Sequence, residues 1–210
     1  MSRLIVIGGG GHGRVVADSA RNSGAFDAIV FVDGAPDRAR AEPDFPVVGT
    51  FEDLESVMRP GDRCIVAIGD NRERSGLLKR VDELGFELAI VVDPSASLSP
   101  GCDLGPGTVV LPQAAVNIGA EVGRGCIINT GATVDHDCRL GECVHMAPGS
   151  HLGGDVVVGD ASWIGIGASV RHGIRIGSNV MVGAGAAVVS PVADDQTVIG
   201  VPARPLEGNG

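Results

Sequence analysis

The chain has 210 residues and a mass of 21.3 kDa, enough for one large domain or two small ones. Its net charge of −10 argues against a nucleic-acid partner, because surfaces that bind phosphate backbones are basic. No apolar run approaches the roughly 20 residues that cross a bilayer, and the first residues lack the pattern of a secretory signal. The five cysteines form no CxxC pair, so neither a disulfide framework nor a zinc knuckle is indicated, and we expect a cytoplasmic protein.

The chain divides near Ser97 into two halves of different composition. Residues 1–97 carry 27 charged residues and all five phenylalanines, whereas residues 98–210 carry only 15 charged residues and the single tryptophan. We therefore expect two domains, over 1–97 and 98–210.

Strand and helix signals alternate in the first half. The apolar runs predict strands over 4–7, 29–32, 47–48, 64–68 and 88–92, and helices over 14–22, 51–58 and 71–84. Gly24 and Gly85 are the stop signals of the first and last helix. This alternation is typical of a small parallel α/β sheet with right-handed crossovers.

A glycine-rich loop follows the first strand and opens the first helix. Gly8, Gly10 and Gly13 have the GxGxxG spacing, and Asp33 ends the next strand. This pattern is the dinucleotide fingerprint, so an NAD oxidoreductase is one alternative. The first half is too short for both halves of a Rossmann domain, and the second half shows no hydride-transfer site. A half-Rossmann-like domain suits one nucleotide diphosphate with an attached sugar.

The second half has a six-residue period. Every sixth position from Leu98 to Val188 carries Leu, Ile, Val or Met, and chance agreement is roughly one in a billion. The sixteen positions are Leu98, Leu104, Val110, Val116, Val122, Ile128, Val134, Leu140, Met146, Leu152, Val158, Ile164, Val170, Ile176, Val182 and Val188.

Small residues recur four positions after most of these aliphatics, among them Cys102, Cys126 and Cys138. Each hexad predicts a short strand and a tight turn, with the aliphatic and the small residue facing a narrow interior. Three hexads make a triangular coil of about 18 residues, so residues 98–190 predict a solenoid of about five coils. A solenoid that serves only as a scaffold is a further alternative.

Four stretches carry a resemblance to a known family: IVIGGGGHG over 5–13, VAIGDN over 66–71, INTGATVDHDCRLG over 128–141 and IGVPAR over 199–204. The chain resembles the NeuD/PglD-like sugar acetyltransferases, which include nucleotide-linked perosamine N-acetyltransferases. The resemblance implies a left-handed β-helix, a homotrimer, acetyl-CoA as co-substrate, and acetyl transfer to an amino group, or in some members a hydroxyl group, of a sugar.

The resemblance also implies where the nucleotide-linked sugar binds. The expected residues are Gly10, Gly11, His12, Asp33, Gly34, Gly69 and Asp70, together with Asn71.

Transfer to a sugar amine requires a base near neutral pH, and histidine is the natural candidate. His136 is flanked by Asp135 and Asp137, and a carboxylate on one ring nitrogen raises the basicity of the other. The resemblance assigns His136 as the base and Asp137 as its partner. Neighbours in an extended segment point to opposite sides, so the acid has to reach His136 around a turn or across a coil.

By the same resemblance, His145 contacts acetyl-CoA near the thioester, and Ile166 and Ala184 lie along the pantetheine arm. His151 and His172 receive no role. The spacing of His136, His145 and His151 fits no common metal-ligand pattern, so we expect no metal.

We therefore predict an acetyltransferase that acetylates the amino group of a UDP- or GDP-linked 4-amino-deoxy sugar. O-acetylation of a sialic-acid-type sugar is the alternative within the family, and an NAD-binding oxidoreductase is the more remote one.

Overall fold

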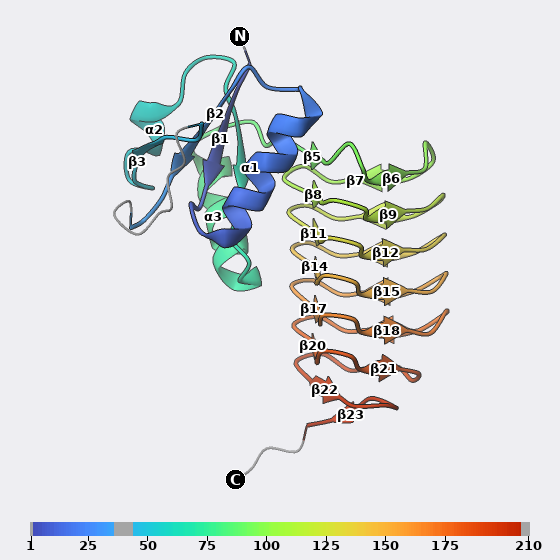
Figure 1. Ribbon diagram of the computed structural model, residues 1–210. Coiled ribbons are helices and arrows are strands. Elements are labelled where there is room, and N and C mark those ends of the chain that lie inside the picture. Colours follow the sequence, from blue (N-terminus) through green and yellow to red (C-terminus); the bar gives the residue numbers. More distant parts are fainter. Residues whose placement is uncertain (1, 36–43, 207–210) are drawn as a thin grey trace.

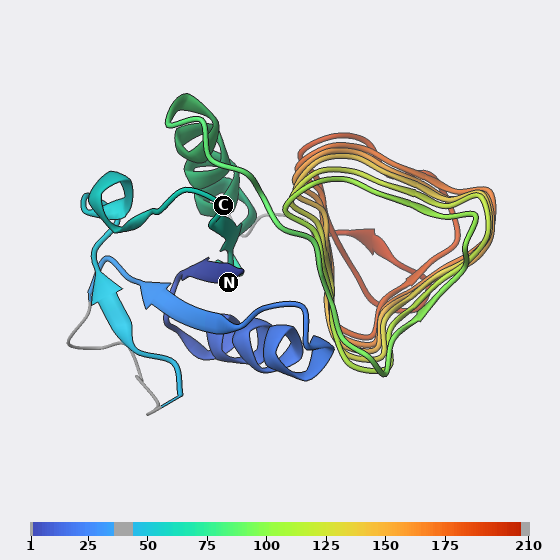
Figure 2. The same cartoon turned by 90° about the horizontal axis from the view of Figure 1, so that it is seen from above.

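The computed structural model of the chain describes residues 2–35 and 44–206. An N-terminal unit of sheet and helices stands beside the first coils of a tall β-helix (Figure 1). Along its axis the β-helix is triangular, and the N-terminal unit packs against one of the three sides (Figure 2). The expected fold class, a small parallel α/β domain followed by a left-handed parallel β-helix, is confirmed.

The N-terminal sheet has four parallel strands in the order β3-β2-β1-β4. Their bounds are β1 (Arg3–Ile7), β2 (Ala28–Val32), β3 (Val47–Gly49) and β4 (Arg63–Val66), and the helices are α1 (Gly11–Ser23), α2 (Leu54–Val57) and α3 (Asn71–Glu83). The same order, 3-2-1-4, is found in the first four strands of a doubly wound Rossmann sheet.

Both faces of this sheet are buried, because side chains alternate along each strand. One face packs against α1, and its cluster extends to Val109 and Ile127 on the outer surface of the β-helix. The other face packs against α2 and α3 through Ile5, Val66 and Leu78. The N-terminal unit and the β-helix therefore share a continuous apolar contact.

The expected strand over 88–92 is divided in the structure, and its assignment to the N-terminal sheet is wrong for its second half. Leu88 forms a bridge to Cys64 beside β4, but β5 (Val91–Val92) pairs with β8 (Val109–Val110) in the β-helix. A short apolar run suits either sheet equally well, so periodicity could not decide between them. Helix α1 also begins three residues earlier than expected.

The β-helix consists of two- and three-residue strands in three sheets. The eight-stranded sheet, which faces the N-terminal unit, contains β5, β8, β11 (Ile127–Ile128), β14 (His145–Met146), β17 (Trp163–Ile164), β20 (Met181–Val182), β22 (Thr197–Ile199) and the antiparallel β23 (Arg204–Pro205). The six-stranded sheet contains β6 (Ser97–Leu98), β9 (Ala115–Val116), β12 (Thr133–Val134), β15 (His151–Leu152), β18 (Ser169–Val170) and β21 (Ala187–Val188). The five-stranded sheet contains β7 (Asp103–Leu104), β10 (Glu121–Val122), β13 (Arg139–Leu140), β16 (Val157–Val158) and β19 (Arg175–Ile176).

Each strand pairs with the equivalent strand of the next coil, for example Ile127 with Val109, as the hexad pattern predicts. All sixteen periodic aliphatics lie in or against the core of the β-helix. Most of the small positions are buried as well. Two of them bond to the next coil, since Cys126 directs Sγ at the carbonyl oxygen of Gly141 and Cys138 directs Sγ at that of Gly153. These cysteines are therefore structural, and burial raises the pKa of the Cys126 thiol to about 12.

Candidate active site

His136, the predicted base, lies in the corner between β12 and β13. Its Nδ1 lies 2.8 Å from Oδ2 of Asp137. The carboxylate accepts the Nδ1 hydrogen, so in the neutral ring the lone pair of Nε2 stays free to take a proton. Asp137 has a φ of +58°, and this left-handed backbone brings the two adjacent side chains together around the turn.

The left-handed conformation belongs to the corner and recurs in neighbouring coils. The same turn position holds Gly119 one coil before Asp137 and Asp155 one coil after it, with φ of +73° and +57°. Aspartate tolerates this conformation better than most residues, because its short polar side chain can bond locally. The fold therefore accepts an acidic residue at the turn position from which Asp137 reaches Nδ1 of His136.

Three carboxylates raise the pKa of His136. The hydrogen bond that the ring donates to Asp137 is the main cause, and the charges of Asp135 and Asp155 add to it. Asp135 itself has another contact set, since its Oδ1 accepts from Asn117 Nδ2 and from the backbone N–H of His136, both at 2.8 Å. Asp135 therefore braces the turn, and Asp137 orients the ring.

Two glycines that the sequence analysis did not single out shape this corner. A Cβ on Gly154 would lie 2.4 Å from His136 Nε2, and a Cβ on Gly119 would lie 2.4 Å from Asp137 Oδ1. Gly154 stands one coil after His136, and Gly119 stands one coil before Asp137. The coil length could therefore have identified both positions.

The glycine-rich loop forms the start of α1, with Gly10 as the N-cap and Gly11 as the first helical residue. Gly13 is required by packing, because a Cβ there would lie 1.8 Å from the carbonyl oxygen of Gly8. Gly10 and Gly11 have open space where a side chain would be. Their backbone is accessible at a helix N-terminus, which is a favourable place for a phosphate.

Asp33 and Gly34 follow β2 at the same edge of the sheet. Asp33 accepts from the backbone N–H of Gly9 at 2.5 Å and from that of Ala35 at 2.7 Å. In this structure Asp33 therefore braces the glycine loop. Gly34 lies against the Phe51 ring, and a Cβ on Gly34 would lie 3.3 Å from the nearest ring carbon.

His145 lies on β14 and faces the N-terminal unit. Its ring packs 3.9 Å from the Trp163 ring and 6.1 Å from the His12 ring, measured between centroids. Burial lowers the pKa of His145 to about 3 and that of His12 to about 4, and the positive charge of Arg74 lowers both further. Both rings are therefore neutral near pH 7. Nε2 of His12 is buried and has no hydrogen-bond partner among the described residues.

Gly69 and Asp70 connect β4 to α3 next to these histidines. Asp70 caps α3 by accepting from the backbone N–H groups of Arg72 and Glu73. A cavity of about 280 Å³ lies between this loop and the β-helix, where Asp70 faces Trp163 and Met181.

Ile166 and Ala184 occupy successive coils of a different corner, the one between the eight-stranded and the six-stranded sheets. The backbone N–H of Gly185 donates to the carbonyl of Ile166, and the Ile166 side chain is 60% exposed. The corner that holds His136, after β12, lies on the far side of the β-helix from the N-terminal unit (Figures 1 and 2). A single chain therefore brings His12, Gly69 and His145 together but keeps His136 apart from them.

The described residues contain no group of three or more His, Cys, Asp or Glu side chains arranged for a metal ion. Within residues 2–35 and 44–206, no helix is long and apolar enough to span a bilayer.

Comparison with known proteins gives two family-model matches. The PglD N-terminal domain matches residues 3–81, and the bacterial transferase hexapeptide model matches residues 155–189. No curated protein matches the chain.

Solved structures match over nearly the whole chain. The acetyltransferase domain of PglB from Neisseria gonorrhoeae FA1090 is 44% identical, covers 97% of this chain and 99% of its own, and superposes with a TM-score of 0.92. The same domain in complex with acetyl coenzyme A is 43% identical, with 97% and 98% coverage and a TM-score of 0.93. PerB from Caulobacter crescentus, in complex with CoA and GDP-perosamine, is 43% identical, with 97% coverage of both chains and a TM-score of 0.89.

The β-helix of hexapeptide repeats matches the bacterial transferase hexapeptide model and a solved acetyltransferase domain, so the chain is an acyltransferase by fold and class. More narrowly, the chain belongs to the NeuD/PglD-like family of sugar acetyltransferases. It is by class an acetyl-CoA-dependent sugar N-acetyltransferase.

Proposed function

We propose that the protein transfers an acetyl group from acetyl-CoA to the amino group of a UDP- or GDP-linked 4-amino-deoxy sugar, with His136 as the general base. The observation that carries this proposal is the Asp137-bound His136, whose Nε2 is free and whose pKa is raised. The sequence likeness to PerB, whose complex contains CoA and GDP-perosamine, supports the substrate class.

The reaction needs no covalent enzyme intermediate. The amine nitrogen attacks the thioester carbonyl as Nε2 of His136 takes one amine proton. The tetrahedral intermediate collapses, the C–S bond breaks, and the imidazolium returns the proton to the leaving thiolate. The products are the amide and CoA thiol, and His136 is neutral again. Asp137 stabilises the imidazolium while it carries the proton.

The N-terminal unit supplies the proposed site for the nucleotide-linked sugar. The starts of α1 and α3, at Gly10–Gly11 and at Asp70, lie at the edge of the sheet where β1 and β4 end. The partial positive charge of a helix start favours a diphosphate. His12 lies at the same edge, and its buried Nε2 has no hydrogen-bond partner within residues 2–35 and 44–206. Asp33, Gly34 and Gly69 border this place. We assign residues 1–97 to this substrate and residues 98–210, with His145, Ile166 and Ala184, to acetyl-CoA.

We further propose a homotrimer, because the candidate residues of one chain do not form one site. His136 occupies a corner away from the N-terminal unit, whereas His12 and Asp70 lie beside the eight-stranded sheet. Three copies around a threefold axis can place the His136 corner of one copy against the N-terminal unit of the next, and such a ring closes on itself. Because acetyl-CoA and nucleotide-linked sugars are cytoplasmic metabolites, we place the reaction in the cytoplasm.

The test is thiol release from acetyl-CoA with a panel of UDP- and GDP-linked 4-amino sugars, followed by NMR of the product. We expect one nucleotide-linked amino sugar to be consumed with an amide at its former amine. Ester formation on a free sialic-acid-type sugar would instead assign O-acetylation. No acetyl transfer to any amine or hydroxyl in the panel, by protein that binds acetyl-CoA, would contradict the proposal.

A further inference from the structure

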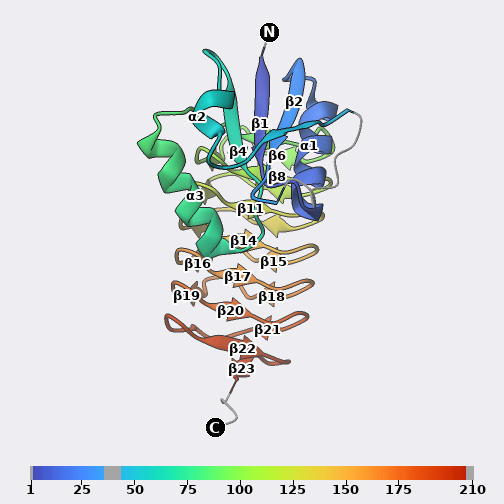
Figure 3. The ribbon, with the colours of Figure 1, turned by 90° about the vertical axis from the view of Figure 1, so that its left-hand side faces the viewer.

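Helix α3 lies along one column of corners of the β-helix (Figure 3). Corner residues Gly125, Cys143 and Ala161 belong to three successive coils and occupy the same left-handed turn position in each. A coil rises by about 4.8 Å and a helix by about 1.5 Å per residue, so about three helical residues match one coil. Side chains of α3 three or four residues apart can therefore each meet a different coil.

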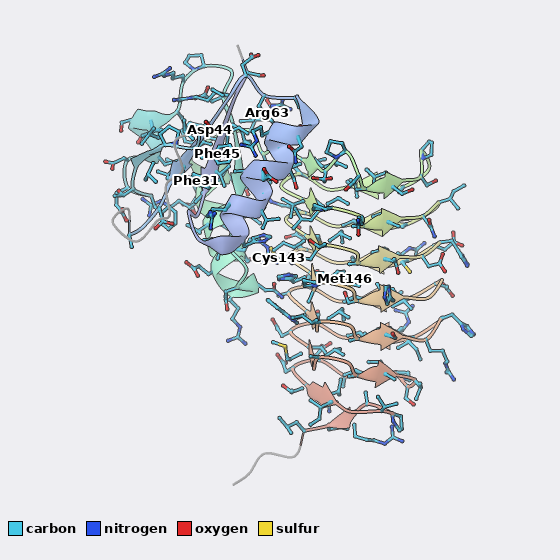
Figure 4. All side chains as sticks on the ribbon, viewed as in Figure 1. Phe31, Asp44, Phe45, Arg63, Cys143 and Met146 are labelled. Carbon is cyan, nitrogen blue, oxygen red and sulfur yellow. The ribbon has the colours of Figure 1, made fainter. Side chains whose placement is uncertain are left out.

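The first turn of α3 contacts successive coils in this way. Asn71 Nδ2 donates to the carbonyl of Ala161 at 2.8 Å. Arg74 donates from Nη2 to the carbonyl of Cys143 and from Nε to that of Gly125, both at 2.7 Å. Cys143 lies at the boundary between the two units (Figure 4). Three consecutive corner carbonyls are thus bound by two side chains one helical turn apart.

Arg74 is completely buried, and each of its five N–H donors has an acceptor. Besides the two corner carbonyls, Nη1 donates to the carbonyls of Ile68 and Gly69, and Nη2 donates to Asn71 Oδ1. A lysine has three donors on one atom and cannot reproduce this fork. All five acceptors are neutral, so none of these hydrogen bonds cancels the positive charge.

The carbonyl of Gly69 connects Arg74 to His145. It accepts from Arg74 Nη1 at 3.1 Å and lies 3.3 Å from His145 Nδ1. A carbonyl oxygen can only accept, so Nδ1 carries the hydrogen of the neutral ring. Nε2 is then the acceptor for Asn129 Nδ2, 3.1 Å away.

We propose that Arg74 is a positioning residue that fixes the Gly69–Asp70 loop against the β-helix and, through the Gly69 carbonyl, sets the orientation and tautomer of His145. The expected effect of Arg74 on the kinetics rests on the proposed function, in which the nucleotide-linked sugar binds beside the Gly69–Asp70 loop. Its spectroscopic consequence is independent of activity.

The experiment compares Arg74→Gln with the matched control Arg124→Gln. Arg124 ties the other end of α3 to the β-helix through Asp82 at 2.6 Å and the Leu78 carbonyl at 3.2 Å, and these partners lie apart from Gly69 and His145. Both variants weaken the attachment of α3, but only Arg74→Gln releases the Gly69 carbonyl. Nitrogen NMR of the histidine rings at pH 7 reports the tautomer of His145 in each full-length protein.

We expect the wild type and Arg124→Gln to show the Nδ1-protonated tautomer of His145, and Arg74→Gln to show a mixture of tautomers. We also expect Arg74→Gln to raise KM for the nucleotide-linked sugar about tenfold or more while kcat changes less than about threefold. An unchanged His145 spectrum and an unchanged KM in folded Arg74→Gln would overturn the inference.

If Arg74→Gln does not fold, Arg74→Lys replaces it, since it keeps the charge but loses the fork. A wild-type His145 spectrum and KM in Arg74→Lys would likewise overturn the inference. If no acetyl transfer is found with any substrate, the NMR result alone decides, so failure of the proposed function is distinct from failure of this inference.

Discussion

Nε2 of His136 lies over Gly154, and a methyl group on Gly154 would stand 2.4 Å from that nitrogen. The ring is held from its other side, where Asp137 binds Nδ1. The ring can keep this orientation only while residue 154 has no side chain. The glycine one coil further along the chain is therefore part of the geometry of the proposed base.

Gly154→Ala tests this relationship. Gly154 does not have a left-handed φ, so alanine strains only the contact with the ring. We expect kcat to fall about 10- to 100-fold, because small displacements of a catalytic group have effects of this size. We expect little change in thermal stability, because Gly154 is buried against the exposed His136 ring, which can move toward solvent. Gly76→Ala is the control, since it is exposed and has nothing within 4 Å of the added Cβ. Equal kcat values in the two variants would show that the ring does not depend on Gly154.

Asp137→Asn separates the charge of the partner from its shape, since asparagine also tolerates the left-handed backbone. Asp137 raises the pKa of His136, and the proposed base is active only when neutral. Removing the charge lowers this pKa, so the acid limb of the kcat/KM profile should move to lower pH. The plateau should fall about tenfold or more, because the base is weaker and less well oriented.

The matched control for that variant is Asp155→Asn, at the equivalent turn one coil later. The Asp155 side chain acts on the His136 ring through its charge, so we expect a smaller shift of the same sign and an unchanged plateau. A profile of Asp137→Asn that coincides with the wild type would mean that Asp137 does not control the base.

Mixed oligomers test whether one site uses two copies of the chain. We would combine a His136→Ala chain with a chain whose nucleotide site is blocked by Gly11→Asp, each inactive alone. Random trimers of equal parts should recover about a quarter of wild-type activity, because three quarters of them are mixed and each mixed trimer has one intact site of three. No recovery in mixed oligomers would place the whole site within one chain.

The buried histidines predict acid instability. The pKa of His145 is about 3 and that of His12 about 4, against 6.5 for an unperturbed group. The unfolded chain therefore binds protons that the folded chain does not, and the free energy of unfolding decreases as pH falls below about 6.5. At pH 5 the loss is about 2 kcal/mol for each histidine.

Urea unfolding of His145→Gln between pH 7 and pH 5 measures this contribution. The pH dependence should be smaller than in the wild type, whereas His172→Gln, at an exposed position, should keep the wild-type dependence. A parallel dependence in wild type and His145→Gln would show that His145 does not bind its proton on unfolding.

The β-helix was predictable because its core repeats at a fixed period, so positions from Leu98 to Val188 could be placed inside before any pairing was known. The pairing of His136 with Asp137 was also expected, by a route either around a turn or across a coil. The sequence did not decide between the two, since the left-handed φ of Asp137 is a property of the corner. Gly154 and Gly119 become visible only when residues one coil apart are compared.

The contact between the two units was not predictable in the same way. Arg74 lies on a helix whose charged residues are mostly exposed, and nothing in its local sequence marks it as buried. Its acceptors at Gly125 and Cys143 are backbone carbonyls, which have no residue-specific signature. The strand over 88–92 was misassigned for a related reason, because its partner depends on tertiary packing.

The most direct test of the account is the rate of thiol release from acetyl-CoA with the accepted nucleotide-linked amino sugar, in the wild type, His136→Ala and His172→Ala. His172 is the matched control, because it is an exposed histidine at the same corner two coils later. We predict that kcat falls about 100- to 10,000-fold in His136→Ala and stays near the wild-type value in His172→Ala, with all three proteins equally stable to heat. Wild-type kcat in His136→Ala would contradict the assignment of His136 as the base.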